Sequence, residues 1–126
     1  MTTLLAVPAT AFAAPAVTKG PVTCSTETSF AGQPCAWQER SPAGLAGVAQ
    51  LTAAGVEPVL VKVELKTQAA WGSPWVTASS ATALRSGPTV ISTPKVVTNE
   101  LSIVCVTTAP AFTPEQQTTL CTHPSA

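Results

Sequence analysis

The sequence predicts an all-β domain: an antiparallel β-sandwich of immunoglobulin-like topology, with a short C-terminal helical turn and two disulfides. Roughly seven short segments of alternating or β-branched residues are separated by Gly and Pro, which is the spacing typical of a sandwich. The 126 residues are enough for one domain. The four cysteines are an even number, as two disulfides require. A small β-barrel is the alternative, because barrels show the same strand punctuation.

The N-terminus has the features of an export signal. A short apolar stretch ends in Ala11-Phe12-Ala13, a small-x-small sequence of the kind that signal peptidase recognises, so we expect cleavage after Ala13. Residues 14–16 offer a second, weaker site. No Lys or Arg precedes the stretch, and a disordered Ala/Pro leader is the alternative. Because short chains with an even set of cysteines occur mainly outside the cytoplasm, we expect a secreted, extracellular protein.

The export signal divides the chain into parts. These are a signal peptide (1–13), a flexible N-terminal segment (14–20), a single disulfide-bonded β domain (21–122) and a frayed tail (123–126). After residue 16 no apolar run approaches the roughly 20 residues that cross a bilayer, so we expect no membrane span.

The charge balance argues against nucleic acid as a partner. Six Lys and Arg offset six Glu, and charged residues make up 10% of the chain against a usual share of about 25%. A nucleic-acid interface needs clustered Lys and Arg to neutralise phosphates. We therefore expect no nucleic-acid interface.

The cysteines are Cys24, Cys35, Cys105 and Cys121. We prefer the pairing of neighbours, Cys24 with Cys35 and Cys105 with Cys121, because a cross-pairing needs two specific strands to meet across the core. A tight hairpin turn at residues 31–33 would separate Cys24 from Cys35 by more than the roughly 7 Å that a disulfide spans, so this pairing requires a wider loop. No Cys-x-x-Cys occurs, and we expect no metal site and no cofactor.

Alternation of side chains predicts the first strands. Val22, Cys24 and every second residue to Phe30 share one face, which predicts a half-buried strand. After a turn at 32–34, residues 35–40 return as a second strand, with Trp37 on the face of Cys35. Residues 41–55 fit either a helix or a strand. Apolar residues recur there at helical spacing, but two glycines would each cost a helix about 1 kcal/mol, so we favour a strand over residues 48–53.

The clearest strand begins at Val59. Its apolar odd residues to Leu65 alternate strictly with Leu60, Lys62, Glu64 and Lys66, which predicts one buried face and one solvated face. A turn from Trp71 to Trp75 leads to a Ser/Thr/Ala-rich strand over residues 76–84.

Three further elements complete the chain. Residues 89–98 are an extended run interrupted by Pro94, which belongs at an edge or a bulge because proline cannot donate to a ladder. Residues 101–106 are apolar on both faces, as in a central strand. Thr113 is a capping residue, followed by Pro114 in the first helical position, so we expect a short helical turn that delivers Cys121.

From Pro58 to Thr108 this order of elements resembles small secreted actinobacterial β-sandwich proteins. The shared pattern is an alternating Val/Lys strand, a Trp-bearing turn, a Ser/Thr strand and a closing strand with an inward cysteine, here Cys105. The resemblance covers under half of the chain. It implies the sandwich fold and no particular activity or site.

Catalytic groups are scarce in this sequence. His123 is the single histidine, and its place in the tail predicts a solvated side chain. There is no Gly-x-Ser-x-Gly elbow, and nothing in the pattern brings two glutamates together as glycoside hydrolysis requires. We therefore expect no catalytic residue and no enzyme.

Trp71 and Trp75 are the candidate binding residues. Tryptophan is the commonest residue at binding hot spots, and the Gly-Ser-Pro turn between these two can hold both rings toward one side. However, three Trp and three Phe are few for filling a core. Packing inside the domain is therefore the favoured expectation for each tryptophan, and for Trp37 above all.

These observations favour a secreted non-enzymatic binding module for another secreted or cell-surface protein, as an adaptor or accessory subunit of an extracellular complex. One alternative is an inhibitor of a secreted hydrolase that inserts the loop Ser29–Pro34. Another is carbohydrate or cell-wall binding through Trp71 and Trp75. Strand addition at a sheet edge is a further route to a partner.

Overall fold

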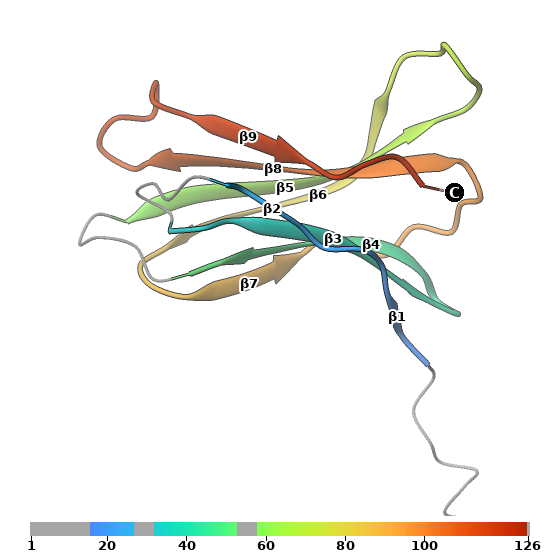
Figure 1. Cartoon of the computed structure of the whole chain (residues 1–126), viewed down its shortest axis with the longest axis horizontal. Helices are drawn as coiled ribbons and strands as arrows, with labels where there is room; N and C mark the ends of the chain where they lie inside the picture. The colour runs from blue at the N-terminus through green and yellow to red at the C-terminus, as the bar shows by residue number, and fades with distance from the viewer. Residues whose placement is uncertain (1–15, 27–31, 53–57, 126) are drawn as a thin grey trace, which may run out of the picture.

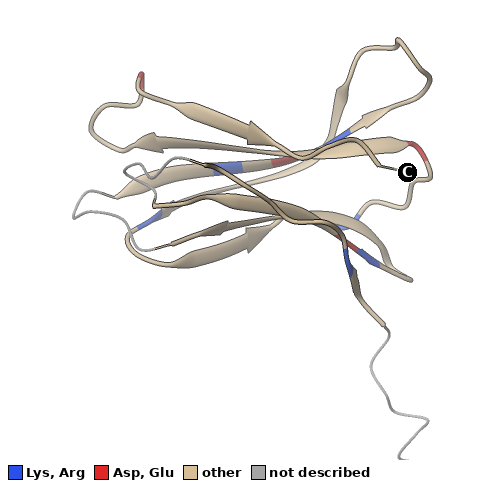
Figure 2. Cartoon of the chain, viewed as in Figure 1, with Lys and Arg blue, Asp and Glu red and all other residues tan. Residues whose placement is uncertain are grey.

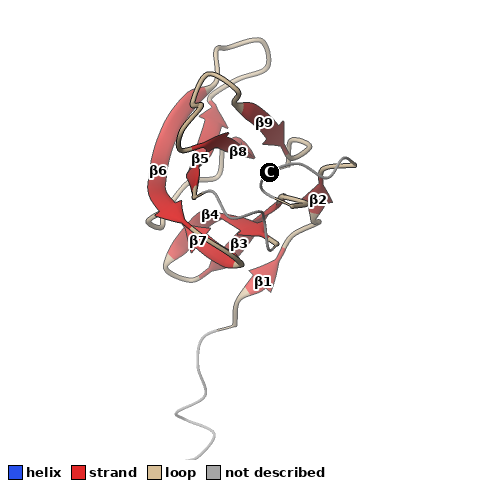
Figure 3. Cartoon of the chain, turned by 90° about the vertical axis from the view of Figure 1, so that its left-hand side faces the viewer, coloured by secondary structure: helices blue, strands red, loops and turns tan. Residues whose placement is uncertain are grey.

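The computed structural model describes residues 16–26, 32–52 and 58–125. These residues form nine β-strands and no helix, arranged in two antiparallel sheets (Figure 1). The sheets face each other in a sandwich-like arrangement, which is clearest along the strands (Figure 3). The all-β prediction is therefore confirmed for this part of the chain.

The first sheet has five strands in the order β1–β3–β4–β7, with β2 also paired to β3. They are β1 (Thr18–Lys19), β2 (Thr23–Cys24), β3 (Cys35–Ser41), β4 (Gly44–Leu51) and β7 (Thr89–Ser92). The second sheet has four strands in the order β6–β5–β8–β9. They are β5 (Val59–Gln68), β6 (Val76–Arg85), β8 (Leu101–Pro110) and β9 (Thr118–Cys121). No strand pairing joins the two sheets within the described ranges, which contradicts the barrel alternative.

The core lies between the sheets and is built on the odd residues of β5. Val59, Val61, Val63 and Leu65 are each at most 3% exposed, so the buried face predicted from their alternation is confirmed. They pack with apolar residues of β4 and β8, namely Leu45, Ala49, Leu51, Val104 and Val106. β8 lies between β5 and β9, as its two apolar faces predicted.

β4 resolves the ambiguous segment 41–55 in favour of a strand, which begins four residues earlier than expected. Its glycines allow close packing rather than helix formation. Gly44 has a φ of 132°, and a Cβ there would lie 2.8 Å from the Val96 carbonyl oxygen. A Cβ on Gly47 would lie 3.0 Å from Cγ1 of Val104 in the opposite sheet. The strand can therefore approach both neighbours only because these positions lack side chains.

The predicted C-terminal helical turn is wrong. Residues 111–117 form turns instead, with a 3.0 Å hydrogen bond from the Gln116 N–H to the Thr113 carbonyl. The β-branched Thr118 and Thr119 then start β9, whose ladder with β8 places Cys121 opposite Cys105. As a strand, this segment pairs its backbone groups with β8. The local capping pattern at Thr113 does not predict that pairing.

The strand predicted over Val22–Phe30 is also too long. β2 contains only Thr23 and Cys24, and Val22 is exposed. Beyond the strand, Ser25 donates its N–H to the Pro34 carbonyl at 2.9 Å. Because Pro34 has no N–H to return, the ladder ends there. Residues 27–31 lie outside the described part of the chain.

The end of the chain lies along β8. Ser125 and Ser102 exchange backbone hydrogen bonds of 3.0 and 2.8 Å. Thr122 is buried, and its Oγ1 accepts a 3.0 Å bond from the Val104 N–H. The structure thus describes three of the four residues expected to form a frayed tail, and the last of them, Ser125, is paired.

Candidate functional site

Both disulfides pair neighbouring cysteines, as predicted. Cys24 is the register partner of Cys35, with Cα atoms 4.0 Å apart, and Cys105 is the register partner of Cys121, with Cα atoms 4.1 Å apart. A sequence separation of 11 leaves ten residues between Cys24 and Cys35, which is the wider loop that this pairing requires. Each disulfide therefore joins two strands of a single sheet.

The disulfides lie on the outer faces of their sheets. Ala36, next to Cys35, and both neighbours of Cys105 belong to the core, so strand alternation turns the two cysteines outward. The inward cysteine that the resemblance implies is therefore wrong for Cys105. Its register partner on β5 is Glu64, a residue of the solvated face, and Cys105 is buried there beside Cys121.

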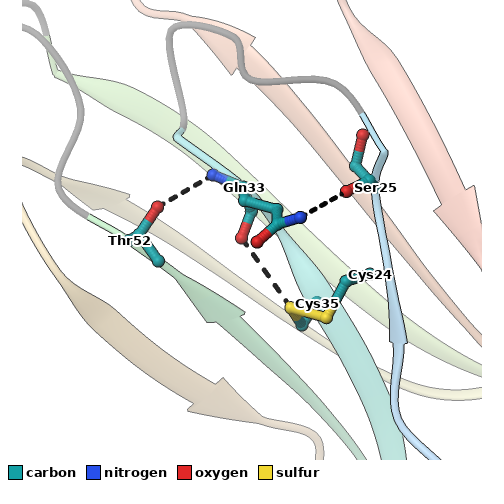
Figure 4. Close-up of a disulfide and its surroundings, with 5 residues drawn as sticks. All are labelled: Cys24, Ser25, Gln33, Cys35 and Thr52. Carbon is teal, nitrogen blue, oxygen red and sulfur yellow. Dashed lines mark hydrogen bonds between the residues drawn. A yellow bond between two sulfur atoms is a disulfide. The ribbon is translucent and has the colours of Figure 1, made fainter.

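Gln33 holds the base of the loop that follows Cys24 (Figure 4). Its Nε2 donates to the Ser25 carbonyl and its N–H donates to Thr52 Oγ1, both at 2.8 Å. Its carbonyl oxygen lies 3.8 Å from Cys35 Sγ, which has no proton to donate because it is in a disulfide. In the loop expected to enter a hydrolase, the described residues around Gln33 are therefore held by hydrogen bonds. Residues 29–31 of that loop lie outside the described part of the chain.

Trp37 is buried, as expected, but on the outer face of the first sheet. Only 5% of its surface is exposed, and its register partner Val48 is buried as well. Lys19 of β1 places its Nζ 4.2 Å from the ring centroid, and the indole Nε1 donates to Glu39 Oε2 at 3.0 Å. A cation on the ring face and an anion at the N–H stabilise the ring in place. Sequence reasoning missed this cluster, although Trp37 and Glu39 are two apart in a strand and therefore share a face.

Trp71 lies at the tip of the β5–β6 hairpin, residues 69–75, which projects from the sandwich (Figure 1). Its side chain is 93% exposed. The expectation that it packs in the core is therefore wrong. Trp75, at the foot of β6, is half-buried. The two rings that the sequence placed together thus have different environments.

The backbone beneath Trp71 is held by local hydrogen bonds. The Ser73 N–H donates to the Ala70 carbonyl at 2.9 Å, and the Ser73 carbonyl accepts a 2.7 Å bond from Gln68 Nε2. Gly72 has a φ of 88°, in the left-handed region that glycine favours, and nothing lies within 4 Å of a Cβ built there. The tip therefore combines an ordered backbone with a side chain in water.

The opposite ends of the sandwich each carry an exposed aromatic residue. Gln68, at the end of β5, is the register partner of Leu101, at the start of β8, so the Trp71 tip lies at the end where β8 begins. Phe112 follows the other end of β8 and is 77% exposed. The two aromatic side chains are thus separated by the length of the sheet.

A groove of about 220 Å³ opens where β1, β3 and the C-terminal segment meet. Its wall includes Gln38, whose Nε2 donates to the Ser102 carbonyl at 3.0 Å. Gln38 Oε1 accepts from Ser102 Oγ at 3.2 Å and from Ser125 Oγ at 3.3 Å. Because these bonds satisfy the amide within the protein, Gln38 links the two sheets rather than offering a free polar group to a ligand.

Charges of both signs are spread over several elements of the described chain, and β5 carries three of them, Lys62, Glu64 and Lys66 (Figure 2). The ion pair that the structure records joins Lys62 Nζ and Glu64 Oε2 at 3.7 Å, on the solvated face of β5. Within the described ranges, no group of three or more His, Cys, Asp or Glu side chains could hold a metal ion. His123 is exposed. Among the same residues no helix has the length and apolarity that crossing a bilayer requires.

The candidate functional site is accordingly the hairpin tip at Trp71. Comparison of the chain with protein-family models, with curated proteins and with solved structures finds no match. Trp71 is distinguished by its exposure and by the hydrogen bonds that order its turn.

Proposed function

We propose that this chain is a secreted, non-enzymatic module that binds another secreted or cell-surface protein through the tip of its β5–β6 hairpin. Two disulfides in a small all-β chain are compatible with an extracellular location. The observation that carries the proposal is Trp71, an indole ring 93% exposed on an ordered turn. An exposed indole contributes a large contact area with few side-chain torsions to fix, which is why tryptophan dominates hot spots.

The chemistry around Trp71 favours protein over carbohydrate. A sugar site combines a stacking ring with several polar groups that point at the ligand. Here the Ser73 backbone groups already bond to Ala70 and Gln68, and the second indole, Trp75, is half-buried. Val76, at the start of β6, is also apolar and is 59% exposed. A mainly apolar tip matches the core of a protein interface.

The test is capture of a partner with tagged protein from the culture medium of the source cells, using the unaltered chain, Trp71→Ala and Phe112→Ala. The recovered protein is then purified and its affinity measured directly. We expect Trp71→Ala to weaken binding by about 2 kcal/mol or more, as loss of a tryptophan hot spot does, and Phe112→Ala to bind like the unaltered chain. Phe112 is the matched control because it is an exposed aromatic residue at the opposite end of β8.

Other outcomes contradict the proposal. If both variants lost the same affinity, or if neither lost any, Trp71 would not be the contact residue. A fluorescence shift with cell-wall polysaccharide that Trp71→Ala abolishes would favour the carbohydrate alternative, and inhibition of a secreted protease or glycosidase would favour the inhibitor alternative. Unfolding of Trp71→Ala should match that of the unaltered chain within about 0.5 kcal/mol, because the ring is in water.

We infer an immunoglobulin-like topology for the seven strands from β3 to β9. The support is their order: β3–β4–β7 in one sheet and β6–β5–β8–β9 in the other correspond to an A-B-E sheet and a C′-C-F-G sheet. The disulfides differ from the immunoglobulin pattern, since each joins strands of one sheet rather than bridging both sheets. Cross-strand proton contacts by NMR that placed β6 beside β7 instead of β5 would contradict this topology.

A further inference from the structure

β6 is the longest edge strand that the structure describes. It spans Val76–Arg85, ten residues, and within the described ranges it pairs with β5 alone. Figure 3 shows it at the rim of the molecule, with β5 on its inner side. From Val76 to Leu84 it contains no charged residue and no proline. A register shift opposite Leu65 and Lys66 makes a β-bulge at Ala78, so the regular part of the strand is residues 79–85. Its outer edge therefore offers a long row of unpaired backbone groups.

The other edges of the two sheets are protected. β1 and β2 have two residues each and are separated by a segment that contains Pro21. β7 and β9 have four residues each, and Pro94 and Pro124 follow them within three residues. Short length and nearby proline are the means by which proteins blunt sheet edges. Pro74 and Pro88 flank β6 at similar distances, so length distinguishes it: β6 has ten residues, and the other described edge strands have two or four.

The side chains of β6 suit pairing with an identical strand. Residues 77–83 are all Ser, Thr or Ala. An antiparallel pair of two β6 strands therefore brings small neutral residues opposite small neutral residues, whichever nearby register is adopted. No like charges meet over Val76–Leu84, and no bulky side chain stands on the central part of the strand. We propose that the free edge of β6 binds β6 of a second copy of this chain. This pairing joins the four-stranded sheets of the two copies into one continuous antiparallel sheet.

This pairing closes on itself. A two-fold axis perpendicular to the sheet uses the same edge of both copies, so that no further copy can add there. The edge left at each end of the joined sheet is β9, which is short. The expected product is therefore a dimer and not a fibre. The Trp71 tips of its two copies point in opposite directions, because antiparallel strands place the two β5–β6 turns at opposite ends.

The test is the oligomeric state of the purified chain by sedimentation over a range of concentrations, with Ser80→Lys as the disrupting variant. Ser80 is exposed, lies near the middle of β6 and is the register partner of Glu64, so a lysine there is compatible with the folded monomer. In a dimer the two introduced lysines approach each other across the shared ladder. We expect a dimer for the unaltered chain and a dissociation constant raised roughly fivefold by Ser80→Lys, with part of the loss recovered in high salt.

Thr119→Lys is the matched control, because Thr119 is exposed on β9 at the other edge of the same sheet. It should dimerise like the unaltered chain. Hydrogen exchange on the unaltered chain decides the question even if Ser80→Lys fails to fold: amides of β6 should gain protection as the concentration rises. A chain that stays monomeric at millimolar concentration would overturn the proposal. So would a dimer that Thr119→Lys weakens and Ser80→Lys does not.

Discussion

Trp37 and Trp71 both lie outside the core between the sheets, yet one is 5% exposed and the other 93%. Trp37 is in a strand, where its ring has a register partner in Val48, a cation above its face in Lys19 and an acceptor in Glu39. Trp71 is on a projecting turn, whose backbone is held by the hydrogen bonds of Ser73 with Ala70 and Gln68. The neighbours supplied by adjacent strands thus decide whether a large side chain contributes to stability or is available for binding.

The largest expected effect in this comparison is at Trp37. Trp37→Ala should lower the free energy of unfolding by about 3 kcal/mol, because a large buried ring is lost and Val48 and Glu39 lose a partner. Trp37→Phe keeps much of the apolar contact but cannot donate to Glu39, so its loss should be smaller. Chemical denaturation with both disulfides intact measures the changes. A loss for Trp37→Ala as small as that of an exposed residue would show that the Trp37 ring does not stabilise the fold.

A smaller effect is expected at Lys19. Lys19→Ala should lower the free energy of unfolding by about 0.5 kcal/mol, because the cation on the Trp37 ring face is exposed to solvent. Lys95→Ala is the control, since Lys95 is also an exposed lysine and has no recorded ring contact. The same denaturation experiment separates the two variants. If both changed stability equally, Lys19 would contribute through its general charge and not through Trp37.

The fold could be predicted from the sequence where the pattern repeats along a strand. The strict alternation from Val59 to Leu65 identified β5 and its buried face, and the two apolar faces over residues 101–106 identified β8 as a central strand. The pairing of neighbouring cysteines was also predicted, because a cross-pairing would need two specific strands to meet across the core. These inferences depend on local spacing, which the backbone geometry of a strand fixes directly.

The remaining features depend on contacts between distant segments. The capping pattern at Thr113 predicted a helical turn, but pairing of β9 with β8 overrode it. The direction of Cys105 depends on its register with Glu64, some forty positions earlier, which no local pattern records. The contact of Trp37 with Lys19 of β1 likewise joins segments that are distant in the sequence. The exposure of Trp71 could not be predicted from composition. A small number of aromatic residues does not indicate which of them lies exposed on a turn.

Acrylamide quenching of tryptophan fluorescence tests most directly whether Trp71 is the exposed contact residue of this module. The unaltered chain and Trp71→Phe are compared, alone and with the captured partner. We predict that Trp71→Phe removes the most readily quenched part of the emission, and that the partner shields this part in the unaltered chain. Equal quenching of the two chains, or emission from Trp71 that the partner leaves fully open to acrylamide, would contradict the account.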